Sequence, residues 1–265
     1  MPVNIHGLVL IIVCNSSGFP VFTLTLYVTC CIIPPMKIMI NIILGSLIIG
    51  YAFGCINLSY ILSKLKGFDI RKYGSGNAGA SNVVIVLGKK AGLTIAVLDI
   101  LKAFIAFRIA QYVFPEAMSG DINYAGVIAG VGSVLGHIFP FYMGFKGGKG
   151  LACFGGTVLA INYVMFIILF IAALFIAIIT DYICFAPITM AFIVPITIGI
   201  VYKTWVPSAI MAVASVAMLY KHRQNIERIR SGEELRFHFL WRRKDESERF
   251  GVIDDGKDIF NREVK

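Results

Sequence analysis

Long runs of residues without charge constrain this chain more than any other feature. The stretches Tyr163–Thr180 and Ile183–Tyr202 contain no charged side chain and approach the ~20 residues that a transmembrane helix needs. Only 15% of all residues are charged, and the mean hydropathy is +0.81. The sequence therefore predicts an all-α fold, a polytopic helical membrane protein with short cytoplasmic glycine-rich loops.

Further apolar stretches predict five to seven transmembrane crossings in total. They are Ile38–Leu62, Ala91–Phe114, Ile122–Met143, Leu151–Thr180 and Val206–Tyr220. If the Lys146–Lys149 loop and Lys221 are both cytoplasmic, an even number of crossings must lie between them, and three apolar stretches do not satisfy this condition. Either Leu151–Thr180 divides into two crossings, or the last two stretches act as one bent crossing. Because Val206–Tyr220 is short for a span, we favour an irregular or re-entrant element there, with Asp181 and Tyr182 in an outer turn.

The charge distribution predicts the orientation and the domain organisation. The loop Ser63–Lys90 carries six basic side chains against Asp69 alone, so it is expected in the cytoplasm, as is the chain from Lys221 onward. Residues 36–235 form the membrane domain and residues 236–265 a polar cytoplasmic tail. Residues 1–35 are either an extra span or an extension upstream of Met36, and no signal peptide is expected there. The net charge of +9 favours anionic substrates over nucleic acid.

A glycine-rich loop with two lysines lies within the stretch Gly136–Gly156. Lys146 and Lys149 flank Gly147 and Gly148, and cations are costly in an apolar sequence. Backbone N–H groups in a glycine turn together with ammonium groups can hold an anion, most naturally phosphate. The stretch is not a nucleotide-binding P-loop, because Met143 stands where the first glycine belongs. The simpler interpretation is a flexible turn that follows the positive-inside rule.

Two other polar segments are predicted on the same side of the membrane. Gly74–Asn82, with the sequence GSGNAGASN, offers short polar groups for a ligand. The alternative is that Ser81 or Asn82 caps the following helix. In the segment Lys221–Glu234, His222 and Asn225 share one helix face. The alternative for this segment is an amphipathic helix at the membrane surface.

Asp99 and Lys102 are ionisable residues inside an apolar stretch. Their spacing places them on one helix face, where they form an ion pair that faces the bundle interior or a polar cavity. A packing pair that sets the helix register is the alternative. The six cysteines show no spacing typical of metal ligands and are expected to be buried as small hydrophobic residues. No metal and no cofactor are therefore expected.

The three polar segments, in this order and spacing, resemble the motifs of the bacterial membrane family of acyl-phosphate:glycerol-3-phosphate acyltransferases. The resemblance covers about residues 38–235. It implies transfer of an acyl chain from acyl phosphate to the 1-hydroxyl of glycerol 3-phosphate, which gives lysophosphatidic acid and phosphate in phospholipid synthesis. It also implies a multi-pass protein of the plasma membrane with a cytoplasmic active site, and no nucleic acid partner. The oligomeric state is not predicted.

The resemblance also assigns roles to residues of the three motifs. It implies a catalytic group without a covalent acyl-enzyme, a larger group that binds phosphate, and two residues that support the local structure. The catalytic group is Ser75, Lys149, His222 and Asn225. The phosphate-binding group is Gly74, Gly76, Asn77, Lys102, Lys146, Gly147, Gly148 and Gly150. The supporting residues are Asp99 and Glu234.

One departure from the family pattern concerns acceptor binding. The family has an arginine that helps bind the acceptor three residues after Asn82, and this chain has Ile85. The loss makes a divergent member with another acceptor, or one that only binds a phosphorylated lipid, the main alternative. An anion transporter is the alternative from another class, although the sequence has no internal repeat. If glycerol 3-phosphate is the acceptor, Ile85→Arg is expected to tighten its binding.

Overall fold

The computed structural model describes residues 9–14, 20–25, 36–232, 234 and 236–240, and the chain divides into two compact units, Met1–Met39 and Ile40–Lys265. In the first unit, β1 (Val9–Cys14) pairs antiparallel with β2 (Pro20–Thr25). The described residues of the predicted 1–35 segment are thus strands, and not a membrane-spanning helix. The predicted tail 241–265 lies outside the described residues.

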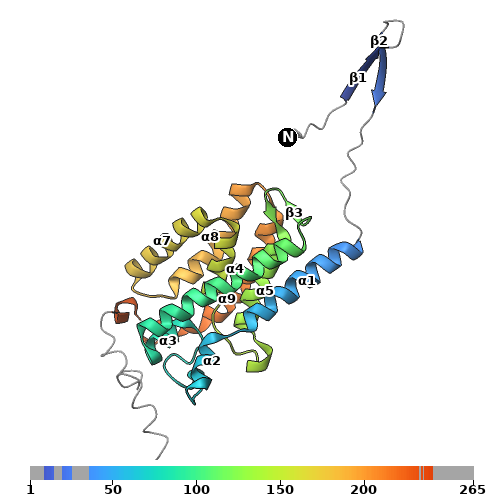
Figure 1. The fold of residues 1–265 in the computed structure, drawn as a ribbon. Helices are drawn as coiled ribbons and strands as arrows, with labels where there is room; N and C mark the ends of the chain where they lie inside the picture. Colours follow the sequence, from blue (N-terminus) through green and yellow to red (C-terminus); the bar gives the residue numbers. More distant parts are fainter. Residues whose placement is uncertain (1–8, 15–19, 26–35, 233, 235, 241–265) are drawn as a thin grey trace, which may run out of the picture. The chain divides into compact units, whose positions relative to one another are not determined.

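The second unit is built of helices with one small two-stranded sheet (Figure 1). The helices and strands follow one another in the order α1 (Met36–Cys55), α2 (Leu58–Leu65), η1 (Ile70–Lys72), α3 (Ala80–Leu87), α4 (Lys89–Val113), β3 (Met118–Ser119), β4 (Ile122–Asn123), α5 (Tyr124–Ile138), η2 (Phe141–Met143), α6 (Leu151–Ile161), α7 (Tyr163–Thr180), α8 (Phe185–Tyr202), α9 (Trp205–Arg230) and η3 (Phe237–Leu240). The strands β3 and β4 pair antiparallel between α4 and α5.

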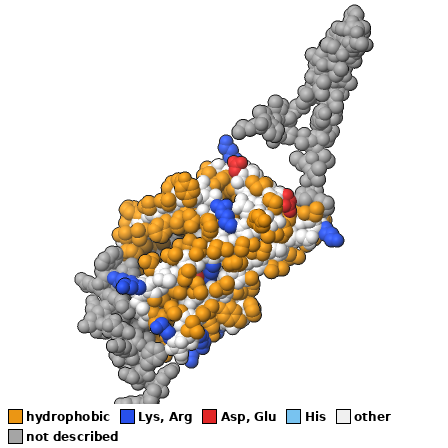
Figure 2. All heavy atoms as spheres, viewed as in Figure 1, with side chains coloured by type: hydrophobic (Ala, Val, Ile, Leu, Met, Phe, Trp, Pro, Cys, Tyr) orange, Lys and Arg blue, Asp and Glu red, His pale blue; other side chains and the backbone are white. Residues whose placement is uncertain are grey.

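The predicted helical membrane fold is confirmed. Four stretches of the described residues are long and apolar enough to cross a membrane: Met36–Leu65, Tyr124–Met143, Tyr163–Thr180 and Phe185–Tyr202. Hydrophobic side chains cover most of the visible face of the helical unit (Figure 2). Exposure of such a large apolar surface to water would be unfavourable, whereas contact with lipid chains is not.

The long apolar stretch Leu151–Thr180 divides into two helices at Asn162. The Asn162 side chain accepts a hydrogen bond from the Met165 backbone, so it caps the N-terminus of α7. Its amide also donates to the Tyr202 hydroxyl at the end of α8, at 3.1 Å. The division was one of the two predicted solutions for the number of crossings. The other solution, the re-entrant element at Val206–Tyr220, is wrong, because those residues belong to the 26-residue helix α9.

The predicted outer turn at Asp181 and Tyr182 is also wrong. The Asp181 carboxylate accepts hydrogen bonds from the backbone and the ring of His238, so this turn lies at the end of the bundle that holds the C-terminal segment. The opposite end is marked by Ser119 and Thr204, whose hydroxyls lie 2.7 Å apart. Because α7 is a separate helix, it brings the chain back to the end that the charge pattern assigns to the cytoplasm.

The core lies where α4, α5, α6, α8 and α9 meet. Its fully buried members include Phe154 of α6, Ile198 of α8 and Met211 of α9. Glycines bring α1 close to α5: a Cβ on Gly50 would lie 1.9 Å from the Ala129 carbonyl oxygen. Small residues at such contacts let helices pack closely in lipid, where van der Waals contact replaces the hydrophobic effect.

Candidate functional site

A cavity of about 740 Å³ lies at the end of the bundle that carries the charged loops. It is lined by the N-terminal ends of α3 and α6, by α4, α7 and α8, and by the C-terminal end of α9. All three sequence motifs contribute to its wall, through Ser75, Lys149 and His222 among others. Ser75 and His222, which are more than 140 positions apart in the sequence, thus line the same cavity.

The first glycine-rich loop is held by one buried side chain, Asn82. Its amide nitrogen donates to the backbone oxygens of Ile70 and Tyr73, at 3.0 and 3.1 Å. Its oxygen accepts the Ser75 N–H at 2.8 Å. Asn82 therefore supports the loop and does not cap α3, whose N-cap is Gly79.

Ser75 and Asn77 both line the cavity, as the predicted site requires, together with Gly74. Gly76 is exposed and is not part of the lining. Gly74 and Gly76 both have positive φ, 57° and 72°, so the loop turns where other residues would be strained. Their role is to shape the loop that carries Ser75 and Asn77.

The second loop differs in detail from its prediction. Gly147 and Gly148 donate their N–H groups to the carbonyl oxygens of Ile138 and His137, at 3.1 and 3.0 Å. The expectation that these N–H groups are free for an anion is therefore wrong. Lys146 is exposed and does not line the cavity, whereas Lys149 and Gly150 do.

Two helices begin at the cavity without a side-chain cap. The N-caps of α3 and α6 are Gly79 and Gly150, and neither has a side chain to satisfy the first N–H groups of its helix. The first residues of both helices, Ala80 and Leu151, belong to the cavity lining. Unsatisfied N–H groups and the helix dipole both favour an anion at such a position. The cavity therefore has two helix N-termini in its wall that favour an anion.

The third motif forms a chain of polar contacts beside Lys149. The Lys149 ammonium donates to the Asn225 side-chain oxygen at 2.6 Å. The Asn225 amide nitrogen in turn donates to Glu234, which also accepts from Arg228 Nε at 2.8 Å. This arrangement agrees with the supporting role predicted for Glu234.

Lys149 keeps donors for a ligand in this arrangement. Within the described residues, Asn225 is its one hydrogen-bond acceptor, so two of the three ammonium N–H groups are available. Burial, together with the nearby Arg228, lowers the pKa of Lys149 to about 8, while Glu234 opposes the shift. A bound phosphate would restore the charge that burial disfavours.

His222 is buried beside the cavity with one ring nitrogen engaged. Its Nδ1 lies 2.8 Å from the Met218 carbonyl oxygen, which can only accept a hydrogen bond. The proton must therefore be on Nδ1, and Nε2 is left as an acceptor. This is the tautomer that a general base requires.

Asp99 and Lys102 form the predicted ion pair, at 2.8 Å. The Lys102 ammonium also donates to Ile56 O at 2.8 Å and Gly54 O at 3.3 Å, and contacts His137 Nδ1 at 3.1 Å. Its donors are thus taken by the protein, and Lys102 does not line the cavity. The prediction that Lys102 binds phosphate is not supported by this geometry, because no ammonium donor remains for a ligand.

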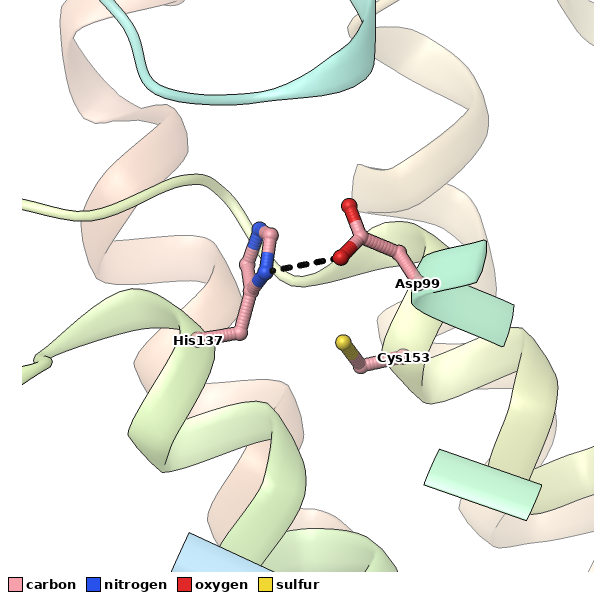
Figure 3. A group of neighbouring side chains, drawn as sticks. All are labelled: Asp99, His137 and Cys153. Atoms are coloured by element: carbon pink, nitrogen blue, oxygen red, sulfur yellow. Dashed lines mark ion pairs between the residues drawn. The ribbon is translucent and has the colours of Figure 1, made fainter. Parts of the chain in front are cut away.

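Asp99, His137 and Cys153 bring potential metal ligands together, with the ligand atoms within 4.8 Å of one another. Figure 3 shows the carboxylate of Asp99 and the ring of His137 pointing toward each other, with the Cys153 thiol nearby. The Lys102 ammonium contacts both Asp99 and His137, so it already supplies the positive charge that a metal would bring. We therefore interpret this group as a buried ion-pair cluster.

Sequence reasoning missed three residues of this region. His137 and Arg228 line the cavity, and both lie inside the motif sequences that carry the assigned residues. Asp181 holds the C-terminal segment: it accepts from His238 Nδ1 at 2.8 Å and pairs with Arg236 at 3.6 Å. The signal for Asp181 was present, since it is the one charged residue between two apolar runs.

Ile85 lies away from the cavity. It is 2% exposed and packs in an apolar cluster with Phe68, Ile70 and Met143. An arginine there would place a charge among these side chains. The expectation that Ile85→Arg tightens acceptor binding is therefore replaced by an expectation of lower stability.

Comparison with known proteins relates the whole helical unit to one family. A family profile described as glycerol-3-phosphate acyltransferase matches residues 44–232. Relatives named glycerol-3-phosphate acyltransferase include one from Allorhizobium ampelinum, 35% identical over 75% of this chain and 93% of its own length. Another, from Aquifex aeolicus, is 36% identical over 72% of this chain and 96% of its own length.

Solved structures agree with the sequence relatives. The crystal structure of PlsY (YgiH), an integral membrane glycerol 3-phosphate acyltransferase, in its glycerol 3-phosphate form, has a TM-score of 0.68 at 35% identity. The match covers 75% of this chain and 96% of that one. The lysophosphatidic acid form gives a TM-score of 0.65 at 34% identity, over 73% and 94% of the two chains. These matches confirm the family resemblance of the three motifs.

Proposed function

The chain belongs to the glycerol-3-phosphate acyltransferase family, and from this premise we propose that it transfers an acyl chain from acyl phosphate to the 1-hydroxyl of glycerol 3-phosphate. The products are lysophosphatidic acid and inorganic phosphate. Relatives carry the acyltransferase name, and one related structure is described with glycerol 3-phosphate. The choice of acyl phosphate as donor is ours and depends on the shape and charge of the cavity.

The two uncapped helix N-termini in one cavity are the observation that carries this proposal. Both substrates of the proposed reaction bear a phosphate, so the site needs two anion positions. The N-termini of α3 and α6 provide them, next to the ammonium of Lys149 and the guanidinium of Arg228. A thioester donor has no phosphate on the reacting carbonyl, so it would need only one anion position beside the acyl carbon.

The rest of the cavity suits an acyl chain. Away from the charged groups its wall is apolar, with Phe154 of α6, Phe170 and Leu174 of α7 and Met190 of α8. Burial of each methylene of a chain in such surroundings contributes about 0.8 kcal/mol. One end of the cavity therefore suits a phosphate and the other suits a hydrocarbon chain. An acyl phosphate has the same two parts, a charged head and an apolar tail.

We assign the proton transfer to His222. Its bare Nε2 accepts the proton of the 1-hydroxyl while the hydroxyl oxygen attacks the acyl carbon. A new ester C–O bond forms, the bond between the acyl carbon and the phosphate oxygen breaks, and the proton passes from His222 to the departing phosphate. No covalent acyl-enzyme is needed.

Lys149, Ser75 and the helix N-termini stabilise the charge that moves during this step. The Lys149 ammonium is fixed by Asn225, so it does not have to reorganise when negative charge develops on the phosphate. The Ser75 hydroxyl lies on the loop that Asn82 holds, and Ser75 lines the cavity together with Lys149. Asp99 and Lys102 act as support, through the buried cluster behind His137.

We further propose that the charged end of the bundle faces the cytoplasm at the plasma membrane, with seven crossings by α1 and α4 to α9. The basic loop Ser63–Lys90 and the basic residues after Tyr220 lie at that end. An excess of basic side chains favours the cytoplasmic side. Glycerol 3-phosphate would then enter from the cytoplasm and the acyl donor from the membrane.

The test is an acyl-transfer assay with the purified full chain in lipid nanodiscs. Labelled glycerol 3-phosphate and palmitoyl phosphate are expected to give labelled lysophosphatidic acid, whereas palmitoyl-CoA alone is expected to give none. Product from palmitoyl-CoA at the same rate would overturn the donor assignment. No product from either donor, with palmitoyl phosphate still bound, would favour the divergent binding protein over the acyltransferase.

A further inference from the structure

Helix α7 lines the cavity with one continuous apolar face. The lining residues recur at helical spacing between positions 166 and 177: Phe166, Leu169, Phe170, Ala173, Leu174 and Ala177. The opposite face of the same helix is turned outward, with Phe175 62% exposed. The helix therefore separates the cavity from the surroundings of the bundle, and its inner face is a wall without a polar group.

The direction of the three helices around the cavity shows where it ends. Helices α6 and α8 begin at the charged end, while α7 finishes there, because Asp181 follows it. The lining residues farthest from the charged end are therefore Val158 on α6, Phe166 on α7 and Val194 on α8. From Ala177 back to Phe166 the helix rises about 16 Å.

Phe166 is the largest of the three side chains at this closed end, and its position is defined. Its ring stacks on that of Phe170 with centroids 5.8 Å apart. Helix α6 faces it with Gly155, where an added Cβ would lie 3.4 Å from Phe166 Cε2. An alanine at this position would therefore just touch the ring, whereas a larger side chain would displace it, so the ring lies directly against α6 at this end of the cavity.

We propose that Phe166 sets the longest acyl chain that this protein accepts, with its ring lying against Gly155 of α6. The inference rests on the proposed function, since it takes the apolar part of the cavity as the site of the donor chain. A chain whose phosphate is held near Lys149 runs along α7 until it meets the Phe166 ring. Longer chains must bend or leave the phosphate out of place.

Two substitutions test the position from opposite directions. Phe166→Ala removes the ring and leaves space at the end of the cavity, so the upper limit of chain length rises, by about two or more carbons. Gly155→Val adds methyl groups that push the ring toward the cavity, so the limit falls. The measurement is kcat/KM of the full chain in nanodiscs with glycerol 3-phosphate and a series of saturated acyl phosphates of increasing length.

Phe175→Ala is the matched control, because it is the same substitution on the same helix but on the outward face. Its chain-length profile is expected to equal that of the wild type. The inference is overturned if Phe166→Ala and Gly155→Val both transfer chains with the wild-type profile. If the wild type transfers no chain, the proposed function fails instead. The chain-length dependence of acyl phosphate binding, followed by the melting temperature, then still tests Phe166.

Discussion

Lys102 and Lys149 are two buried cations of the same bundle with opposite relations to the cavity. Lys102 is 6% exposed and has its donors taken by Ile56, Gly54 and His137, in addition to its ion pair with Asp99. Lys149 lies at the cavity wall with a single described acceptor, Asn225. The family resemblance placed Lys149 in the catalytic group and Lys102 in the phosphate-binding group, so both were expected to contact substrate.

The difference shows that burial of a charge does not by itself indicate a binding site. A buried cation whose donors are all matched supports the fold, and one whose donors are left over is available to a ligand. In this chain Lys102 is paired inside the bundle with Asp99 and His137, whereas Lys149 borders the cavity with donors left for a ligand. The following experiments test this difference by stability, by turnover and by pH dependence.

The largest effect is expected for Lys102→Met, measured as stability. Removal of Lys102 leaves the buried Asp99 carboxylate with the ring of His137, 3.5 Å away, as its remaining ionic partner, and breaking a buried ion pair costs about 3–5 kcal/mol. The melting temperature in nanodiscs should fall strongly, while Lys149→Met should lower it little. Equal melting temperatures of the two variants would show that the comparison is wrong.

Lys149→Ala is expected to reduce turnover about 100-fold with the fold intact, because a charge-assisted contact to phosphate in a partly dry site is lost. Lys146→Ala is the matched control, since Lys146 lies three positions away in the same loop but is exposed and outside the cavity lining. A loss of similar size in both variants would mean that the loop acts through its net charge.

The pH dependence of the reaction should report on Lys149. Its pKa is lowered to about 8, chiefly by burial, so the free enzyme carries the charge below pH 8 and loses it above. The value of kcat/KM should therefore fall as the pH rises through about 8. Bound phosphate favours the charged form, so kcat should fall only at higher pH.

Lys149→Arg tests this assignment, since a guanidinium stays charged throughout the range. In that variant the decline near pH 8 should disappear, whatever its absolute rate. A decline that stays in place would assign the titration to another group.

The smallest effect, a severalfold loss of turnover, is expected for Asp181→Asn. Asp181 holds the segment of His238 and Arg236, which follows Glu234 in the chain, so it keeps Glu234 in contact with Asn225 and Arg228. The melting temperature should change little, because the Lys102 cluster does not depend on this segment. Loss of stability without loss of turnover would contradict this role.

Much of the fold and of the cavity wall could be predicted from the sequence because apolar runs and polar motifs carry strong signals. The spans and the placing of the three motifs at one end follow from length and charge. The division at Asn162 was less visible, since it depends on one amide that caps α7 and bonds Tyr202, far away in the sequence. The position of Asp181 could not be predicted for the same reason.

The details of the phosphate site depend on backbone hydrogen bonds that a sequence does not display. Gly147 and Gly148 look like free donors until their carbonyl partners at Ile138 and His137 are known. Likewise the family comparison singles out Ile85, but only packing shows that its side chain lies in an apolar cluster. Motifs identify which residues matter, and tertiary contacts decide what each one does.

The brevity of α6 has a consequence for how reactants and products travel. The helix has 11 residues and so rises about 16 Å, roughly half of the ~30 Å hydrocarbon layer, and it ends beside Tyr202 at the far side. On the proposed arrangement of seven crossings, its first turn would start well below the headgroup plane. A water-soluble acceptor would then descend a short well to react, spent phosphate would climb back up it, and the newly made lipid would leave sideways without crossing water.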